Sequence, residues 1–213
     1  MKIENKILIL GICLWILLSF LVNITTGYFR FDPTRCYQWA TFISDWLYNI
    51  FIGIFILMIA VLNKKKKKGE FAKCFFIMLI IAIIVNSCKY IFFSNEFTRP
   101  SGSIGGFPSG HSFTAFAMAF IFSINFPKLS TFSMLSAFLV AWSRIYAGGK
   151  VRSFVFSTEF YEPMQDKIPA HYPYQVVWGS ILGLLLAYIL YVYWENIIDF
   201  FKTLKHKKLI NKP

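Results

Sequence analysis

The chain has 213 residues, of which 57% are hydrophobic, 20% aromatic and only 15% charged. Ordinary soluble domains are about half apolar and about a quarter charged, so this composition argues against a soluble globular protein. The net charge of +12 does not indicate nucleic-acid binding, because many of the lysines flank apolar runs, where they orient membrane helices and contact anionic lipid. The four cysteines have no spacing typical of a metal or redox site, so we expect neither a disulfide nor a zinc site.

Six apolar runs approach the length of about 20 residues that a helix needs to cross a bilayer. No small-residue cleavage site follows the first run, so we expect a retained helix rather than a signal peptide. The sequence therefore predicts an all-α, polytopic helical bundle of about six transmembrane helices, forming one domain over residues 1–213. The predicted spans are roughly Ile7–Ile24, Trp46–Leu62, Cys74–Phe93, Ser109–Phe126, Leu129–Ala147 and Tyr174–Tyr193.

Most of the basic residues fall on one side of these spans. By the positive-inside rule this side is cytoplasmic, and both termini then lie inside. The loops over residues 25–45, 94–108 and 148–173 are expected to face outward. The lysines that define the inner side are Lys2, Lys6, Lys64 to Lys68, Lys73, Lys128, Lys202, Lys205, Lys207, Lys208 and Lys212.

Five polar residues gather at the outer ends of the last four predicted spans. Lys89 lies near the end of the third span, and Arg99 follows in the next loop. His111 opens the fourth span, Arg144 ends the fifth, and His171 stands just before the sixth. Polar groups in a membrane are costly, so each needs a reason. Three cations and two histidines at one depth suit a phosphoryl group, with the histidines as acid–base or nucleophilic groups.

The start of the fourth span adds a second feature that favours an anion. Ser109 and Gly110 are predicted to place free backbone N–H groups at the beginning of a helix, which is a common anion-binding arrangement. His206, the third histidine, lies in the basic tail and is expected to be a solvated bystander.

These residues form three blocks in a fixed order. The blocks are Lys89…Arg99-Pro100, then Pro108-Ser109-Gly110-His111, then Ser143-Arg144…His171. In this order they resemble the motifs of the phosphatidic acid phosphatase type 2 (PAP2) superfamily of membrane phosphatases, and in particular its lipid A phosphatases. The resemblance spans roughly Lys89 to Gly179 and implies a helical core with an active site at the outer face.

The resemblance also implies roles for individual residues. Lys89, Arg99 and Arg144 would bind phosphate oxygens, helped by the region of Ser109 and Gly110. Phosphoryl transfer relies mainly on positioning and charge stabilisation, which such a set of cations supplies.

Both histidines would take part in the chemistry. His171 would attack phosphorus to form a phosphohistidine. His111 would protonate the leaving oxygen and later activate water. The resemblance implies no cofactor and no metal.

The chain departs from the family pattern at Gln175, where the family has an aspartate that orients the nucleophilic histidine. A glutamine accepts a hydrogen bond from the imidazole but brings no charge. Three outcomes stay open: slower catalysis, loss of activity, or replacement of the aspartate by Asp166, Glu162 or Glu159.

Two spacers are also longer than in the commonest form of the family. Nine residues (90–98) separate Lys89 from Arg99, as occurs among lipid A phosphatases, and 26 residues (145–170) separate Arg144 from His171. The extra segment, over about residues 148–170, is either a lid that reads a large head group or a tolerated insertion.

The expected function is hydrolysis of a phosphomonoester on a membrane lipid, at the periplasmic face of a bacterial inner membrane. Lipid A, at its 4′- or 1-phosphate, is the first candidate, and undecaprenyl diphosphate or phosphatidylglycerophosphate is the alternative. A lipid phosphotransferase and a catalytically silent lipid-binding protein remain open as other classes. The expected partners are the lipid substrate and the bilayer, with no nucleic acid and an open oligomeric state.

Overall fold

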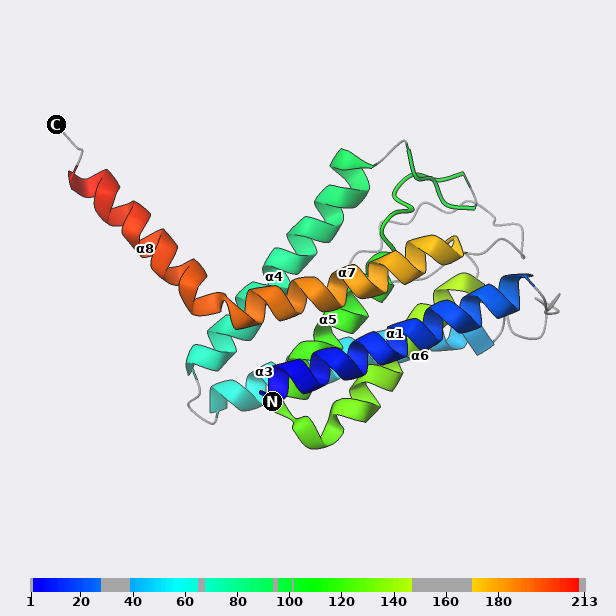
Figure 1. Ribbon diagram of the computed structural model, residues 1–213, viewed down its shortest axis with the longest axis horizontal. Coiled ribbons are helices and arrows are strands. Elements are labelled where there is room, and N and C mark those ends of the chain that lie inside the picture. Colours follow the sequence, from blue (N-terminus) through cyan, green and yellow to red (C-terminus); the bar gives the residue numbers. More distant parts are fainter. Residues whose placement is uncertain are drawn as a thin grey trace.

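The computed structural model describes residues 2–27, 39–64, 68–93, 96–100, 102–146 and 170–210. Throughout these ranges the regular structure is helical, which confirms the expected all-α class. The helices run back and forth as a bundle, from which the last helix projects (Figure 1). Their bounds are α1 (Ile3–Gly27), η1 (Ile43–Leu47), α3 (Tyr48–Lys64), α4 (Lys68–Ser87), η2 (Cys88–Phe92), α5 (Gly110–Asn125), η3 (Pro127–Leu129), α6 (Ser130–Tyr146), α7 (Pro173–Val192) and α8 (Trp194–Ile210).

The predicted spans coincide with helices of the bundle. For α5, α6 and α7 the observed ends lie within one residue of the predicted ones. The second and third helical rods each contain a π-helical stretch, η1 and η2, in which the backbone bonds i to i+5 rather than i to i+4. Hydrophobic patterning does not reveal these stretches, because they change the helix pitch over only five residues.

Three helical segments are long and apolar enough to cross a bilayer: Ile3–Leu21, Gly69–Phe92 and Pro173–Val192. The apolar segment Tyr48–Leu62 is shorter. Large apolar side chains on this shorter segment, such as Ile56 and Leu57, stay exposed, as expected of a surface that faces lipid. The chain is thus a helical membrane protein. Six crossings stay a prediction, because α5 and α6 have only 16 and 17 residues.

Helix α5 is the centre of the bundle. Its residues from Ser112 to Ser123 are buried with the exception of Thr114, so the helix is apolar nearly all round, as a fully enclosed helix must be. Its main packing partners are α6 and α7. A hydrogen bond of 2.7 Å between the Ser123 and Ser133 hydroxyls joins it to α6 and satisfies both buried groups.

Two glycines bring α7 against α5. A Cβ atom at Gly179 would lie 2.8 Å from the backbone oxygen of Ser109, and one at Gly183 would collide with the carbonyl of Phe113. The spacing of four residues therefore packs two helices within one chain, as small-residue pairs do in membranes. This contact places the start of α7 beside the start of α5, where the predicted site residues lie.

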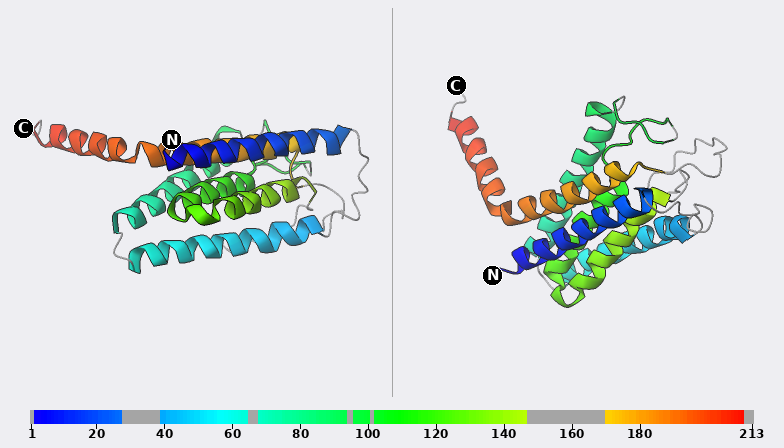
Figure 2. Two further views of the ribbon diagram at one scale, coloured as in Figure 1. Left: turned by 60° about the horizontal axis from the view of Figure 1, so that its bottom comes forward. Right: turned by 45° about the vertical axis from the view of Figure 1, so that its right-hand side comes forward.

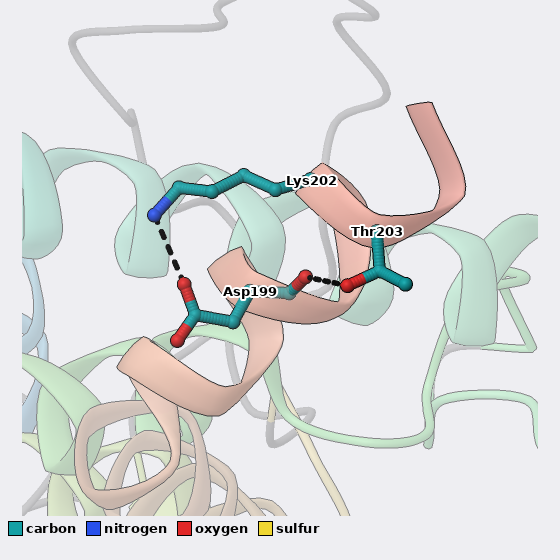
Figure 3. Close-up of polar contacts among 3 residues, drawn as sticks. All are labelled: Asp199, Lys202 and Thr203. Atoms are coloured by element: carbon teal, nitrogen blue, oxygen red, sulfur yellow. Dashed lines mark hydrogen bonds and ion pairs between the residues drawn. The ribbon is translucent and has the colours of Figure 1, made fainter. Parts of the chain in front are cut away.

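Helix α8 leaves the bundle beyond Trp194 and extends away from it (Figures 1 and 2). The prediction of six spans ends before this helix. Lys202 and Asp199 form an ion pair of 2.9 Å on its surface, and the Thr203 hydroxyl donates to the Asp199 carbonyl (Figure 3). Both charged side chains are largely exposed, so the pair contributes little to stability.

Candidate active site

Lys89 is held at the site by the π-helical stretch η2. The side chain is buried, with 7% of its surface exposed. It lies against the first residue of α5: a Cβ atom at Gly110 would stand 3.1 Å from the Lys89 ammonium nitrogen. Glycine at position 110 therefore leaves room for the Lys89 ammonium at the N-terminus of α5. The positive end of the helix dipole repels this cation unless an anion lies between the two.

His171 is buried just before α7, and its orientation is defined by two acceptors. The ring Nδ1 lies 3.0 Å from the Gly106 carbonyl oxygen and 3.1 Å from Gln175 Oε1. Both partners accept hydrogen bonds, so Nδ1 carries the proton and donates it. The lone pair of the neutral ring then sits on Nε2, the atom that a nucleophilic histidine uses.

Gln175 joins His171 to the loop that precedes α5. Its Oε1 also accepts from the Tyr172 backbone N–H at 3.1 Å, and its Nε2 donates to the Thr98 carbonyl at 2.9 Å. The amide is fully buried, and a Cβ atom at Gly106 would come within 2.5 Å of its nitrogen. An aspartate here would be shorter and would offer no donor to the Thr98 carbonyl.

Arg144 is the largest buried polar side chain of the site, with 2% exposed. It lies in the last turn of α6, and its Nη1 donates to the hydroxyl of Ser44, which is fully buried. Ser44 belongs to η1. Both π-helical stretches thus carry a polar residue of the site, and π-bulges often occur at functional positions.

His111 lies in the first turn of α5 under the ring of Tyr48. The two ring centroids are 4.2 Å apart at an interplanar angle of 48°. The Tyr48 hydroxyl is 2.7 Å from that of Thr114, which in turn donates to the Gly110 carbonyl at 2.8 Å. His111 Nε2 is buried and has no hydrogen-bond partner within the described part of the chain, so this atom is available to a bound group.

Arg99 sits in a tight turn of the loop between η2 and α5. Its backbone N–H donates to the Ser103 carbonyl at 2.9 Å, and its own carbonyl accepts from the Gly102 N–H at 2.8 Å. Gly102 has a φ of 80°, which favours glycine. Burial lowers the pKa of the Arg99 guanidinium from its ordinary value, and its buried Nε has no partner among the described residues.

The backbone at Ser109 differs from the prediction of a free N–H. This N–H donates to the Gln175 carbonyl at 3.0 Å, because the glycine contact of α7 brings the two backbones together. The Ser109 hydroxyl accepts from Ser112 at 3.0 Å, which leaves its own proton to be donated. The unpaired N–H groups of the helix start therefore begin at Gly110.

The predicted cations act together on His171. Burial lowers the pKa of His171 well below 6.5, and the positive charges of Arg144, Lys89 and Arg99 lower it further, against a smaller opposing effect of the hydrogen bond to Gln175. The imidazole is therefore neutral at physiological pH. An anion among these groups would find three positive charges and a ring able to attack it.

A family model described as the PAP2 superfamily matches residues 70–153. The chain is thus similar to the PAP2 superfamily over 84 of its 213 residues. No curated protein and no solved structure matches the chain. PAP2 superfamily members are phosphatases, so this similarity implies phosphatase activity on lipid-like phosphates. The match includes Lys89, Arg99, His111 and Arg144 and ends before His171.

Two residues of the site lie outside the range of the PAP2 match and were not among the site residues predicted from the sequence. Ser44 and Tyr48 lie far upstream of the first motif, so no motif spacing points to them. The available signal is their separation of four residues, which places two polar groups on one face of a largely apolar helical rod.

Other predicted features fall outside the described residues or side chains. These are the inserted segment with Glu159, Glu162 and Asp166, and the side chain of His206. Among the residues that are described, no three His, Cys, Asp or Glu side chains come together as a metal site would require.

Proposed function

We propose that this protein hydrolyses a phosphomonoester on a membrane lipid through a phosphohistidine at His171. The observation that carries the proposal is the state of that ring. Its Nδ1 proton is engaged by two acceptors, its pKa is low, and three cations surround it. Neutral Nε2 can thus act as a nucleophile toward an anion that these cations attract.

In the first step the Nε2 lone pair of His171 attacks phosphorus, and the bond from phosphorus to the lipid oxygen breaks. His111 donates a proton to that leaving oxygen, so the lipid departs as an alcohol. Lys89, Arg99 and Arg144 stabilise the charge on the three equatorial oxygens. His111 is then neutral and ready to accept a proton.

In the second step a water molecule attacks the phosphohistidine. His111 takes its proton, the bond from nitrogen to phosphorus breaks, and inorganic phosphate leaves. His171 and His111 return to their starting states. Every proton and bond is balanced by these groups, so the proposed cycle is independent of a metal.

Within this chemistry we favour lipid A, at the 4′- or 1-phosphate, as the substrate, with the active site facing the periplasm of a bacterial inner membrane. The long spacer between Lys89 and Arg99 and the extra segment before His171 support a bulky head group. Undecaprenyl diphosphate and phosphatidylglycerophosphate are the alternatives within the same chemistry.

The test is phosphate release by the purified protein in detergent micelles, from lipid A and from the alternative lipids, with and without EDTA. We expect release from at least one of them, unchanged by the chelator and abolished in His171→Ala. Loss of lipid phosphate without free phosphate would indicate a phosphotransferase. If the protein releases phosphate from none of these lipids, a lipid-binding protein is the remaining alternative. If EDTA abolishes activity and added divalent metal restores it, the metal-free cycle is wrong.

A further inference from the structure

The helical rod of residues 39–64 lies outside the sequence range that the family model matches. It nevertheless contributes two polar side chains to the site. Ser44 is fully buried and receives a hydrogen bond from the Arg144 guanidinium. Tyr48, four residues later, packs its ring on His111 and bonds its hydroxyl to Thr114. Each side chain touches one of the groups that the proposed cycle uses.

We propose that Ser44 and Tyr48 are positioning residues, Ser44 for Arg144 and Tyr48 for His111. The proposal rests on the proposed function, since it assigns a purpose to contacts with the phosphate-binding arginine and the general acid. Within the described part of the chain, the hydrogen bonds and ring contacts of these two residues go to Arg144, Thr114 and His111 rather than to His171. Their effect is to restrict Arg144 and His111.

Arg144 needs such support because its long side chain has many rotamers. The hydrogen bond to Ser44 uses one of its five N–H donors and selects one direction for the guanidinium. A guanidinium held in one direction can meet a phosphoryl group without further ordering, which lowers the entropic cost of forming the transition state.

His111 has a different need. Its Nε2 makes no hydrogen bond within the described residues, so no protein group holds the ring at that atom. The Tyr48 ring, with its centroid 4.2 Å away, covers one face of the imidazole, and the hydroxyl anchors that ring to the same turn of α5. General acid catalysis demands such alignment with the leaving oxygen.

The two roles predict different kinetic signatures. A general acid matters when the leaving group is a poor one, such as an alkyl alcohol, and matters little for nitrophenolate, which leaves without a proton. A phosphate-binding arginine matters equally for both, since the phosphoryl group is the same. The quantity to compare is kcat/KM, which ends at formation of the phosphohistidine and so excludes the later role of His111 with water.

The experiment measures kcat/KM for an alkyl phosphate lipid and for p-nitrophenyl phosphate, together with inhibition by orthovanadate. Tyr48→Leu should lose about tenfold or more on the alkyl phosphate and less than about threefold on the nitrophenyl ester, whereas Tyr48→Phe, which keeps the ring but not its hydroxyl anchor, should lose less than Tyr48→Leu on the alkyl phosphate. Ser44→Ala should lose about tenfold on both substrates and raise the inhibition constant for orthovanadate by a similar factor.

Matched controls separate positioning from general damage. Ser136→Ala removes a buried hydroxyl that donates to the Phe132 carbonyl of its own helix, and Tyr188→Leu removes a tyrosine that packs on Phe120 and bonds to Asn5. Both should leave the substrate preference and the vanadate inhibition unchanged. Thermal unfolding of each variant in detergent identifies any that fail to fold.

The outcomes are distinct. An inactive wild-type protein overturns the proposed function and the positioning roles with it. If wild type is active and His111→Ala shows the leaving-group effect, equal losses of Tyr48→Leu on both substrates overturn the role of Tyr48 alone. An unchanged vanadate inhibition constant in folded Ser44→Ala overturns the role of Ser44.

Discussion

At the scale of single residues, the state of His171 depends on an amide where the superfamily pattern has a carboxylate. Gln175 Oε1 accepts from both the ring Nδ1–H and the Tyr172 N–H, and the amide nitrogen satisfies the Thr98 carbonyl. The glutamine thus selects the tautomer of the ring but adds no negative charge to stabilise a cationic form. Its use of both ends of the amide explains why a neutral residue fits this position.

Replacing Gln175 should therefore slow the reaction even when the new residue is the aspartate of the family pattern. Gln175→Asp shortens the side chain and leaves the Thr98 carbonyl without its donor, so we expect a loss of about tenfold in kcat. Gln175→Glu keeps the length but turns an oxygen toward that carbonyl, and its rate should lie between those of wild type and Gln175→Asp. Asn125→Ala, at the other end of α5, is the matched control. A rate above wild type in Gln175→Asp would contradict this account.

The low pKa of His171 predicts the acid side of the pH profile. In the proposed cycle the neutral ring is the nucleophile, so kcat/KM should rise as pH increases through the pKa of His171 in the free enzyme, which lies below the ordinary 6.5. Activity should therefore persist below pH 6.5. Arg99→Gln removes one of the positive charges that depress this pKa, and its acid limb should move to higher pH. The ionisation of the substrate phosphate is common to both proteins, so a shift between them belongs to the enzyme.

The two arginines should tolerate lysine poorly. Arg99→Ala and Arg144→Ala each remove a charge-assisted contact with the phosphoryl group in a buried site, and we expect losses of about a hundredfold in kcat/KM. A lysine restores the charge but not the planar fork that holds two oxygens, and in Arg144→Lys the contact with Ser44 also changes. Near-normal steady-state rates in both lysine variants would argue against this binding mode.

At the scale of helices, the contact of α7 with α5 aligns the two parts of the site that lie farthest apart in the sequence. Gly179 and Gly183 bring α7 onto the backbone of Ser109 and Phe113. The Ser109 N–H then bonds to the Gln175 carbonyl, so the backbone that carries His111 is tied to the one that orients His171. Distances between the two histidines depend on this packing.

Gly183→Ala should consequently destabilise the protein and reduce its activity together. The added Cβ collides with the Phe113 carbonyl, and relief requires α7 to move away from α5. We expect a clear fall in the unfolding temperature, by an overpacking cost of about 1–3 kcal/mol. Gly53→Ala is the matched control: it lies in α3 with no atom within 4 Å of the new Cβ, so better helix propensity should leave it as stable as wild type or slightly more so.

The helices and the residues in the motifs could largely be predicted from the sequence. The residues and backbone contacts that hold the motif residues in place could not. Long apolar runs separated by lysines define α5, α6 and α7 to within one residue. The paired N–H of Ser109 escaped prediction because it depends on how closely two helices pack. Ser44 and Tyr48 escaped because their partners, Arg144 and His111, are far away in the chain, and no local pattern encodes such a contact.

At the scale of the whole molecule, the helical bundle has two chemically different ends. The Lys128 turn lies at the end of α5 opposite to His111, on the same side as the N-terminus and the start of α4 (Figure 2). At that end Lys73 lies 3.7 Å over the Tyr191 ring, and the Tyr191 hydroxyl donates to Glu70. Lys73 and Lys128 thus lie at one end, and the candidate active site with its own cations lies at the other.

This polarity predicts the orientation in the membrane. By the positive-inside rule the Lys128 turn faces the cytoplasm and Glu96 the opposite side. Single cysteines at these two exposed positions, in a chain without other cysteines, should react differently with an impermeant maleimide added to intact cells. We expect labelling of Glu96→Cys in intact cells and of Lys128→Cys only after lysis. The reverse pattern would invert the topology and place the site inside.

Because of the two π-helical stretches, the exact number of residues in these helices matters. A turn with i to i+5 bonding holds one residue more than the α-helical turn it replaces. Deleting one residue from η1 or η2 would let that turn close with regular i to i+4 bonding, so the helix on either side would keep its orientation. The residues inside the turn would shift by one position, and Ser44 and Lys89 lie inside these two turns. Losing a single codon there would therefore change which side chains face the site while leaving the rest of each helix in place.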